Sequence, residues 1–148
     1  MPYLDKYLKI KKSQIAGAGL GLFTTIDIKK GTRITEYAGA LKTWKVLAPK
    51  DGYNAYIFKL NSRWGIDGAK KLKSFGRYAN DATGPTRTPG LRNNCCYETV
   101  KLKCFLDASR NIKAGSELLV PYGGNFWQLV KKINQLEDAK SKKANRKV

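Results

Sequence analysis

Histidine is absent from this sequence of 148 residues. The absence excludes sites that need an imidazole, such as a Ser-His-Asp triad, a Cys-His pair or a catalytic zinc ion held by histidine. The three cysteines, Cys95, Cys96 and Cys104, form no Cys-x-x-Cys pair and are one ligand short of a closed zinc site. They are also too few for a disulfide framework. We therefore expect no metal site and a reducing, intracellular setting.

Long apolar runs are also missing. No stretch approaches the ~18 residues that a membrane-spanning helix requires, so no membrane association is expected. The N-terminal residues 1–6 lack the apolar segment of a secretory signal. Hydrophobic residues make up 42% of the chain and charged residues 27%, which is typical of a soluble globular protein. The length fits one domain of ordinary size.

Acidic residues are scarce. Eleven Asp and Glu face 29 Lys and Arg, which gives a net charge of +18. Solubility alone needs a net charge of only ~2–8, so the excess favours a polyanionic partner over a merely solvated surface. Basic residues are densest at Lys9–Lys12, at Lys70–Lys73 and in the tail after Lys140. This basic surface and tail are candidates for contact with DNA or a nucleosome.

Most of the chain has the pattern of short β-strands. Residues 7–12, 33–37 and 97–106 alternate apolar and polar side chains, and residues 118–120 form a short apolar run. The β-rich runs 56–60 and 63–67 predict a hairpin across Asn61-Ser62. Residues 43–52 are expected to be irregular or a short helix, and residues 80–94 a loop. The expected fold class is mainly β.

A helix is expected only at the C-terminus. Asn125 and Gln128 have the spacing of a capping box, and Leu129, Ile133 and Leu136 follow on one face. We therefore expect an amphipathic helix within residues 128–148. From Lys140 onward the chain is polar and basic, which predicts a tail that is disordered unless it is bound to a partner.

Three glycines, Gly17, Gly19 and Gly21, lie two residues apart and so do not form a G-x-G-x-x-G phosphate loop. A β-prone run, residues 22–26, follows them instead of a helix, and no Gly-Lys-Ser/Thr sequence occurs. Two interpretations remain. The segment is either a tight turn between strands or a loop whose backbone approaches a ligand closely.

Four segments, in this order, resemble the motifs of the SET domain, a family of protein-lysine methyltransferases. They are residues 19–23 (GLGLF), 36–39 (EYAG), 77–82 (RYANDA) with 94–97 (NCCY), and 114–123 (AGSELLVPYG). The resemblance covers about residues 7–127. It implies a β-fold of several small sheets over residues 1–127, a knot-like C-terminal segment and a short C-terminal helix.

The resemblance also implies an S-adenosylmethionine-dependent enzyme that methylates a lysine-bearing protein, expected to be a histone tail in the nucleus or chromatin, including that of a host cell. Tyr122 would be the central catalytic residue, and Tyr37 and Tyr97 would line the lysine channel. Tyrosine suits this task because its ring excludes water while its hydroxyl orients the amine. Contacts to the cofactor would come from Ala18, Gly19, Leu20, Tyr56, Asn80, Asp81 and Trp127.

The sequence departs from the family pattern in two places. Asp81 stands where the family usually has histidine, and no cysteine follows Cys104, so a zinc-binding segment after the domain is missing. Phe126 and Trp127 either cover the cofactor pocket or anchor the C-terminal helix. Two other functions stay open: a non-catalytic basic β-domain that binds nucleic acid or chromatin, and an inactive SET-like module.

Two expectations concern the substrate. A basic histone tail needs a locally acidic groove on this basic protein, and the candidates are Glu36, Asp67, Asp81, Glu98 and Glu117. The Tyr97 hydroxyl would occupy space beside the lysine amine, while Val120, two residues before Tyr122, is small. We therefore expect mono- or dimethylation rather than trimethylation.

Overall fold

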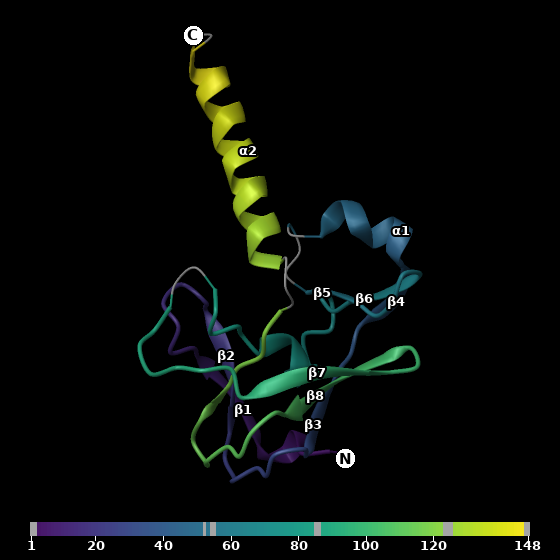
Figure 1. Ribbon diagram of the computed structural model, residues 1–148, viewed down its shortest axis with the longest axis vertical. Helices are drawn as coiled ribbons and strands as arrows, with labels where there is room; N and C mark the ends of the chain where they lie inside the picture. The colour runs from purple at the N-terminus through teal and green to yellow at the C-terminus, as the bar shows by residue number, and fades with distance from the viewer. Residues whose placement is uncertain (1–2, 52, 54–55, 85–86, 123–125, 147–148) are drawn as a thin grey trace.

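The computed structural model describes residues 3–51, 53, 56–84, 87–122 and 126–146, without the side chains of residues 126–129 and 141–146. Its strands form three antiparallel sheets of three strands each (Figure 1). In spatial order the sheets are β1 (Leu8–Lys12), β2 (Leu20–Thr24) and β9 (Glu117–Leu118); β3 (Arg33–Tyr37), β8 (Lys103–Ala108) and β7 (Cys95–Val100); and β4 (Ala40–Thr43), β6 (Trp64–Asp67) and β5 (Ile57–Lys59). The helical elements are η1 (Asp5–Tyr7), α1 (Trp44–Leu47), η2 (Ala48–Lys50), η3 (Phe75–Tyr78) and α2 (Phe126–Arg146).

The main core lies between the first two sheets. Leu22 of β2, Ile34 of β3, Leu106 of β8 and Leu118 of β9 are fully buried there. These residues stand on the inward faces of strands whose neighbouring positions are often polar, as the alternation in the sequence predicts. The mainly β fold of small sheets is therefore confirmed, and the predicted hairpin is present as β5 and β6.

The run at residues 97–106 contains a turn that the sequence did not reveal. It belongs to two paired strands, β7 and β8, which are joined at Lys101 and Leu102. Lys101 adopts a φ of 56°, a left-handed conformation that is uncommon outside glycine, asparagine and aspartate. The alternation continues through the turn and no glycine or proline interrupts it, which is why the pattern alone gave no sign of it.

The chain after β9 is hydrogen-bonded to two separate segments. The Val120 amide donates to the Asn80 carbonyl at 2.8 Å, and the Asn94 and Cys95 amides both donate to the Leu119 carbonyl at 2.9 Å. Residues 118–120 are therefore enclosed between the chain that follows η3 and the start of β7. This enclosure agrees with the expected knot-like C-terminal segment.

Helix α2 extends away from the sheets (Figure 1). It begins at Phe126 and continues to Arg146, so it includes the expected domain boundary at residue 127 and most of the tail, after Lys140, that was expected to be disordered unless bound. The tail contains alanine, lysine and arginine, which are strong helix formers, and no glycine or proline. The expected cap residue, Asn125, lies outside the described residues.

No helix in the described part of the chain is long and apolar enough to cross a bilayer.

Within α2, Ile133 is buried while Leu136 is 53% exposed. The apolar stripe of the helix therefore packs on the body near its start and is open to solvent further along.

The cysteines provide a test of the packing of β7 and β8. Burial raises the pKa of the Cys95 thiol to about 12 and that of Cys104 to about 12, whereas Cys96 is partly exposed. Because the thiolate is the reactive form, we expect native protein at pH 8 to react with a thiol reagent at Cys96 before the other two. Peptide mapping after timed labelling measures this order, with urea-unfolded protein as the control. Equal labelling of all three native thiols would contradict the described packing.

Candidate active site

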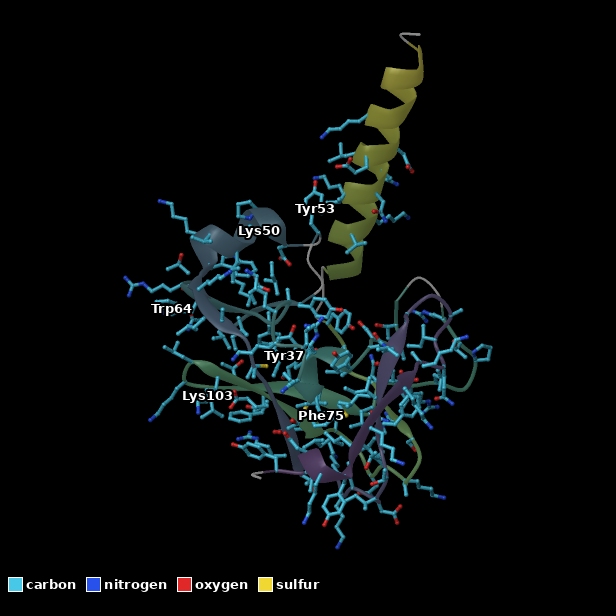
Figure 2. All side chains as sticks on the ribbon, turned by 180° about the vertical axis from the view of Figure 1, so that it is seen from behind. Tyr37, Lys50, Tyr53, Trp64, Phe75 and Lys103 are labelled. Carbon is cyan, nitrogen blue, oxygen red and sulfur yellow. The ribbon has the colours of Figure 1, made fainter. Side chains whose placement is uncertain are left out.

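One cavity of about 780 Å³ gathers residues from separate parts of the chain. It is bounded by the glycine-rich turn before β2, the end of β3, η3 with the residues that follow it, Tyr122, and Val130 and Asn134 of α2. In Figure 2, Tyr37 lies in the middle of the molecule and Tyr53, which also lines the cavity, lies beside α2. The predicted site residues that line this cavity are Ala18, Gly19, Leu20, Tyr37, Tyr56, Asn80, Asp81, Tyr97 and Tyr122. The side chain of Trp127, also predicted, lies outside the described residues.

The glycine-rich turn presents its backbone to this cavity. Gly17 and Gly19 have φ values of 77° and 70°, which residues with a side chain rarely adopt. The Ser13 amide donates to the Gly19 carbonyl at 2.8 Å and closes the turn. Asn80 holds the turn from the other side, because its side-chain amide donates to the Leu20 carbonyl at 2.9 Å.

Glu117 fixes the same turn from β9. It is 3% exposed, and its carboxylate accepts hydrogen bonds from the Ser13 hydroxyl at 2.7 Å and the Gln14 amide at 2.9 Å. No local pattern predicts these contacts, because Ser13 and Glu117 are separated by 104 residues. Glu117 is therefore a positioning residue for the turn and is not available to an exposed acidic groove.

A methyl group at Gly21 tests this arrangement. A Cβ atom there would collide with the Glu117 carboxylate and lie 3.1 Å from the Ser13 Cβ. We expect Gly21→Ala to lower the free energy of unfolding by about 2 kcal/mol or more, because the displaced buried carboxylate loses its donors. Urea unfolding measures the change. Leu20→Ala, at a half-exposed neighbour, is the control with an expected loss below about 1 kcal/mol, and equal losses would contradict the account.

The three predicted tyrosines line the cavity from β3, from β7 and from the chain after β9. The Tyr37 and Tyr97 rings meet edge to face with centroids 5.8 Å apart, and Phe58 of β5 packs on Tyr97 at 4.8 Å. The Tyr37 hydroxyl donates to the Tyr56 carbonyl, and the Tyr122 hydroxyl donates to the Ala79 carbonyl at 2.9 Å. The Tyr97 hydroxyl has no hydrogen-bond partner among the described residues, so its oxygen remains available to a ligand or water.

These three tyrosines are neutral at physiological pH. Burial is the main cause that raises the pKa of each phenol above its usual range, and neighbouring ionisable groups add to the effect. Their hydroxyls therefore act as hydrogen-bond donors and acceptors, and none of them acts as a phenolate base.

Asp81 ties the cavity to the C-terminal segment. One carboxylate oxygen accepts hydrogen bonds from the Thr83 amide (2.8 Å), the Thr83 hydroxyl (2.6 Å) and the Asn93 side chain (3.0 Å), and the other accepts from the Tyr122 amide at 3.0 Å. Burial is the largest single influence on this carboxyl group and opposes ionisation, but the hydrogen bonds together outweigh it and lower its pKa. Asp81 is therefore charged and holds the backbone of Tyr122 in place.

Arg77 is a cavity residue that the sequence analysis did not select. Its Nη1 donates to the Gly68 and Ala69 carbonyls at 3.1 and 2.7 Å, and its guanidinium stacks 4.1 Å from the centroid of the Tyr56 ring. Its Nε is buried and has no acceptor among the described residues. Arg77 belongs to the RYANDA motif, so the motif itself was the signal that pointed to it.

The structure does not bring the five candidates for an acidic groove together on one surface. Asp81 and Glu117 are engaged inside the protein, and Asp67 pairs with Lys42 at 3.4 Å and accepts the Ala69 amide. Glu36 and Glu98 directly adjoin Tyr37 and Tyr97 on β3 and β7. Since successive strand residues point to opposite faces, both glutamates lie on the face of the sheet away from the tyrosines.

In the described part of the chain, no group of three or more His, Cys, Asp or Glu side chains is arranged so that it could hold a metal ion.

The model of the SET domain family matches residues 19–123. This chain belongs to the SET domain family. It is similar to the histone-lysine N-methyltransferase EZH2 of Chaetomium thermophilum, with 30% identity over 86% of this chain and 9% of that protein. It is also similar to the N-lysine methyltransferase KMT5A-A of Xenopus laevis, with 31% identity over 77% of this chain and 36% of that protein.

Solved structures agree with this membership. The humanized mutant of the Chaetomium thermophilum Polycomb Repressive Complex 2, bound to the inhibitor GSK126, matches 84% of this chain and 16% of that chain, with a TM-score of 0.64 and 27% identity. This chain thus spans only part of the length of these relatives, from 9% to 36%.

Proposed function

We propose that this SET domain is an S-adenosylmethionine-dependent protein-lysine N-methyltransferase. The observation that carries the proposal is that Tyr37, Tyr97 and Tyr122 line the same cavity as the glycine-rich turn. An aromatic passage and a backbone cradle that meet in one cavity suit a reaction between an amine and a bound methyl donor.

The residues present fit this cofactor. Cβ atoms built at Gly17 and Gly19 meet nothing within 4 Å, so the backbone of the turn has room for a ligand beside it. The unpartnered Nε of Arg77 can take an acceptor such as a carboxylate. The residues proposed to hold the cofactor are those of the sequence prediction: Ala18, Gly19, Leu20, Tyr56, Asn80, Asp81 and Trp127. S-adenosylmethionine, when bound, supplies a methyl group on a sulfonium sulfur that leaves as a neutral thioether.

The tyrosines favour the neutral form of the lysine amine and orient it. A lysine amine in water has a pKa of about 10.4 and is protonated, so it lacks the lone pair that accepts a methyl group. Aromatic walls at Tyr37 and Tyr97 exclude water and disfavour the charged form. The Tyr122 hydroxyl donates a hydrogen bond to the Ala79 carbonyl, which fixes the direction of its oxygen, and this oxygen would orient the amine or the methyl group as an acceptor.

The ammonium proton has to leave the channel, and the three phenols cannot take it because each stays neutral. We propose that it passes to water. The methylation rate is then set by deprotonation of the lysine itself and rises with pH up to the lowered pKa of the bound amine.

Tyr97 is expected to limit the number of methyl groups that the substrate lysine receives. Its unpaired hydroxyl fills space beside the amine, so we expect mainly mono- or dimethyl product. Tyr97→Phe is expected to raise the share of trimethyl product at least about threefold, because the lost oxygen leaves room for a methyl group. Mass spectrometry of a lysine peptide at matched turnover measures the shares, with Tyr7→Phe as the control. Mainly trimethyl product from the wild-type enzyme would contradict the expectation.

We propose a histone as the substrate, since the similar proteins include histone-lysine methyltransferases. The enzyme would then act in the nucleus or on chromatin, and the chromatin could be that of a host cell. The test is transfer of radiolabelled methyl groups to separate core histones, nucleosomes and a non-histone protein control. Labelling of a histone supports the proposal. Binding of S-adenosylmethionine without labelling would indicate an inactive SET module, and no binding would indicate a non-catalytic domain.

A further inference from the structure

A second cavity, of about 520 Å³, is lined by residues from the stretches 82–83 and 87–93 and by Arg110, and three of its lining residues are arginines. Arg87 and Arg92 come from the second of these stretches and Arg110 from the turn after β8, and all three are exposed. The other lining residues are neutral and include Ala82, Thr83 and Asn93. We name this cavity the arginine pocket.

The three guanidinium groups are free to bind an anion. The ion pairs among the described residues join Arg33 to Asp107 and Lys42 to Asp67, so Arg87, Arg92 and Arg110 have no carboxylate partner there. No acidic residue lines the pocket. Three unpaired positive charges around a hollow repel one another unless an anion occupies it.

The neutral polar groups beside the arginines are already engaged. The Thr83 hydroxyl and the Asn93 side-chain amide both donate to Asp81, and the Asn93 side-chain oxygen accepts the Ala82 amide at 2.8 Å. Thr88, the other neutral polar side chain there, donates to the Gln14 carbonyl at 3.5 Å, so most of the hydrogen-bonding capacity left to the pocket is that of the guanidinium groups, which are donors only. Paired guanidinium donors match the geometry of two oxygens on one phosphate.

We propose that the arginine pocket binds a backbone phosphate of double-stranded DNA. The net charge of +18 is spread over the whole chain and extends well beyond the pocket, which suits a long polymer of phosphates better than a short acidic peptide. The choice of DNA rests on the proposed histone substrate, because DNA surrounds histones in chromatin. The pocket specifies where on the generally basic surface the strongest phosphate contacts lie.

The pocket lies next to the tyrosine cavity. Ala82 and Thr83 line the arginine pocket, while their neighbours Asp81 and Gly84 line the larger cavity. A DNA strand held at the three arginines would therefore lie beside the segment that positions Tyr122, and a lysine on a DNA-bound protein would be delivered near the channel.

The experiment compares two triple variants of equal charge. One is Arg87→Gln, Arg92→Gln and Arg110→Gln; the matched control is Lys9→Gln, Arg63→Gln and Lys103→Gln, which removes exposed charges outside the pocket. Fluorescence anisotropy with a short duplex DNA, without methyl donor, measures affinity across a salt series. Thermal unfolding of both variants checks that they remain folded.

We expect the pocket variant to bind DNA at least about tenfold more weakly and its salt slope to fall by about 1, since the loss of one phosphate contact removes about 0.9 from the slope. The control is expected to lose less than about threefold. Equal losses in the two variants would overturn the proposal, as would a pocket variant that loses binding to polyglutamate but keeps binding to DNA.

Methylation of a free histone peptide is measured separately and is expected to be unchanged in both variants. Because DNA binding is measured without methyl transfer, a wild-type protein that binds DNA but does not methylate would refute the proposed function and leave the test of the pocket intact.

Discussion

Replacing Tyr122 with phenylalanine is expected to lower kcat by about 100-fold or more while cofactor affinity stays within about twofold. The Tyr122 hydroxyl donates to the Ala79 carbonyl and presents its oxygen to the cavity, so its removal takes away the group that orients the reacting atoms. Loss of one precisely placed hydrogen-bonding group in an active site reduces kcat by about 10²–10³. The ring remains, so the shape of the cavity is kept.

Single-turnover kinetics and calorimetric titration with S-adenosylmethionine measure the two quantities separately. Tyr7→Phe removes a hydroxyl that does not line the cavity and serves as the control, with kcat expected to be unchanged. A Tyr122→Phe enzyme with the wild-type rate would remove Tyr122 from the chemistry and leave the aromatic walls as the remaining contribution.

Replacing Asp81 with alanine is expected to lower the free energy of unfolding by about 3 kcal/mol or more. The change leaves the Tyr122 amide, the Thr83 amide and the Asn93 side chain without their acceptor, and buried donors without a partner cost about 1–3 kcal/mol each. Activity is expected to fall as well, because the backbone of Tyr122 loses its anchor. Urea unfolding at pH 7 measures the change in stability.

Because Asp81 is ionised in the folded protein, its contribution to the free energy of unfolding depends on pH. Because its pKa is lower in the folded protein than in the unfolded chain, its stabilising contribution is fully present above the unfolded value of about 3.9 and is lost as pH falls through the folded value. The difference in stability between wild type and Asp81→Asn should therefore be largest near pH 7 and shrink below about pH 4. A difference that stays constant down to pH 3 would indicate that the charge of Asp81 plays no part.

The sequence predicted those features that depend on local pattern, namely the positions of most strands and the residues of the motifs. Alternation located most strands, and the four motifs selected residues that line one cavity, from Ala18 to Tyr122. The contacts that fix this cavity were not predictable in the same way. Asp81 reaches Tyr122 across 41 residues and Glu117 reaches Ser13 across 104, and no local pattern specifies such partners.

Two expectations that differ from the structure have the same cause. The acidic groove was inferred from charge alone, although the alternation already placed Glu36 and Glu98 on the opposite face from Tyr37 and Tyr97. The charge of the tail after Lys140 suggests disorder unless it is bound, although its residues favour helix and α2 continues to Arg146. In both cases net charge was given more weight than the geometry of the backbone.

The irregular pairing of β3 with β8 has a consequence for the chemistry. Arg33 pairs with Asp107 and Thr35 with Leu106, so the chain inserts one extra residue at this point, and the ion pair of Arg33 with Asp107 fastens the end of the strand. If β3 slid along β8 by a single position, a carboxylate would replace a phenol inside the cavity. This small irregularity near the start of the strand thus decides which of two neighbouring side chains, Glu36 or Tyr37, a bound lysine would meet.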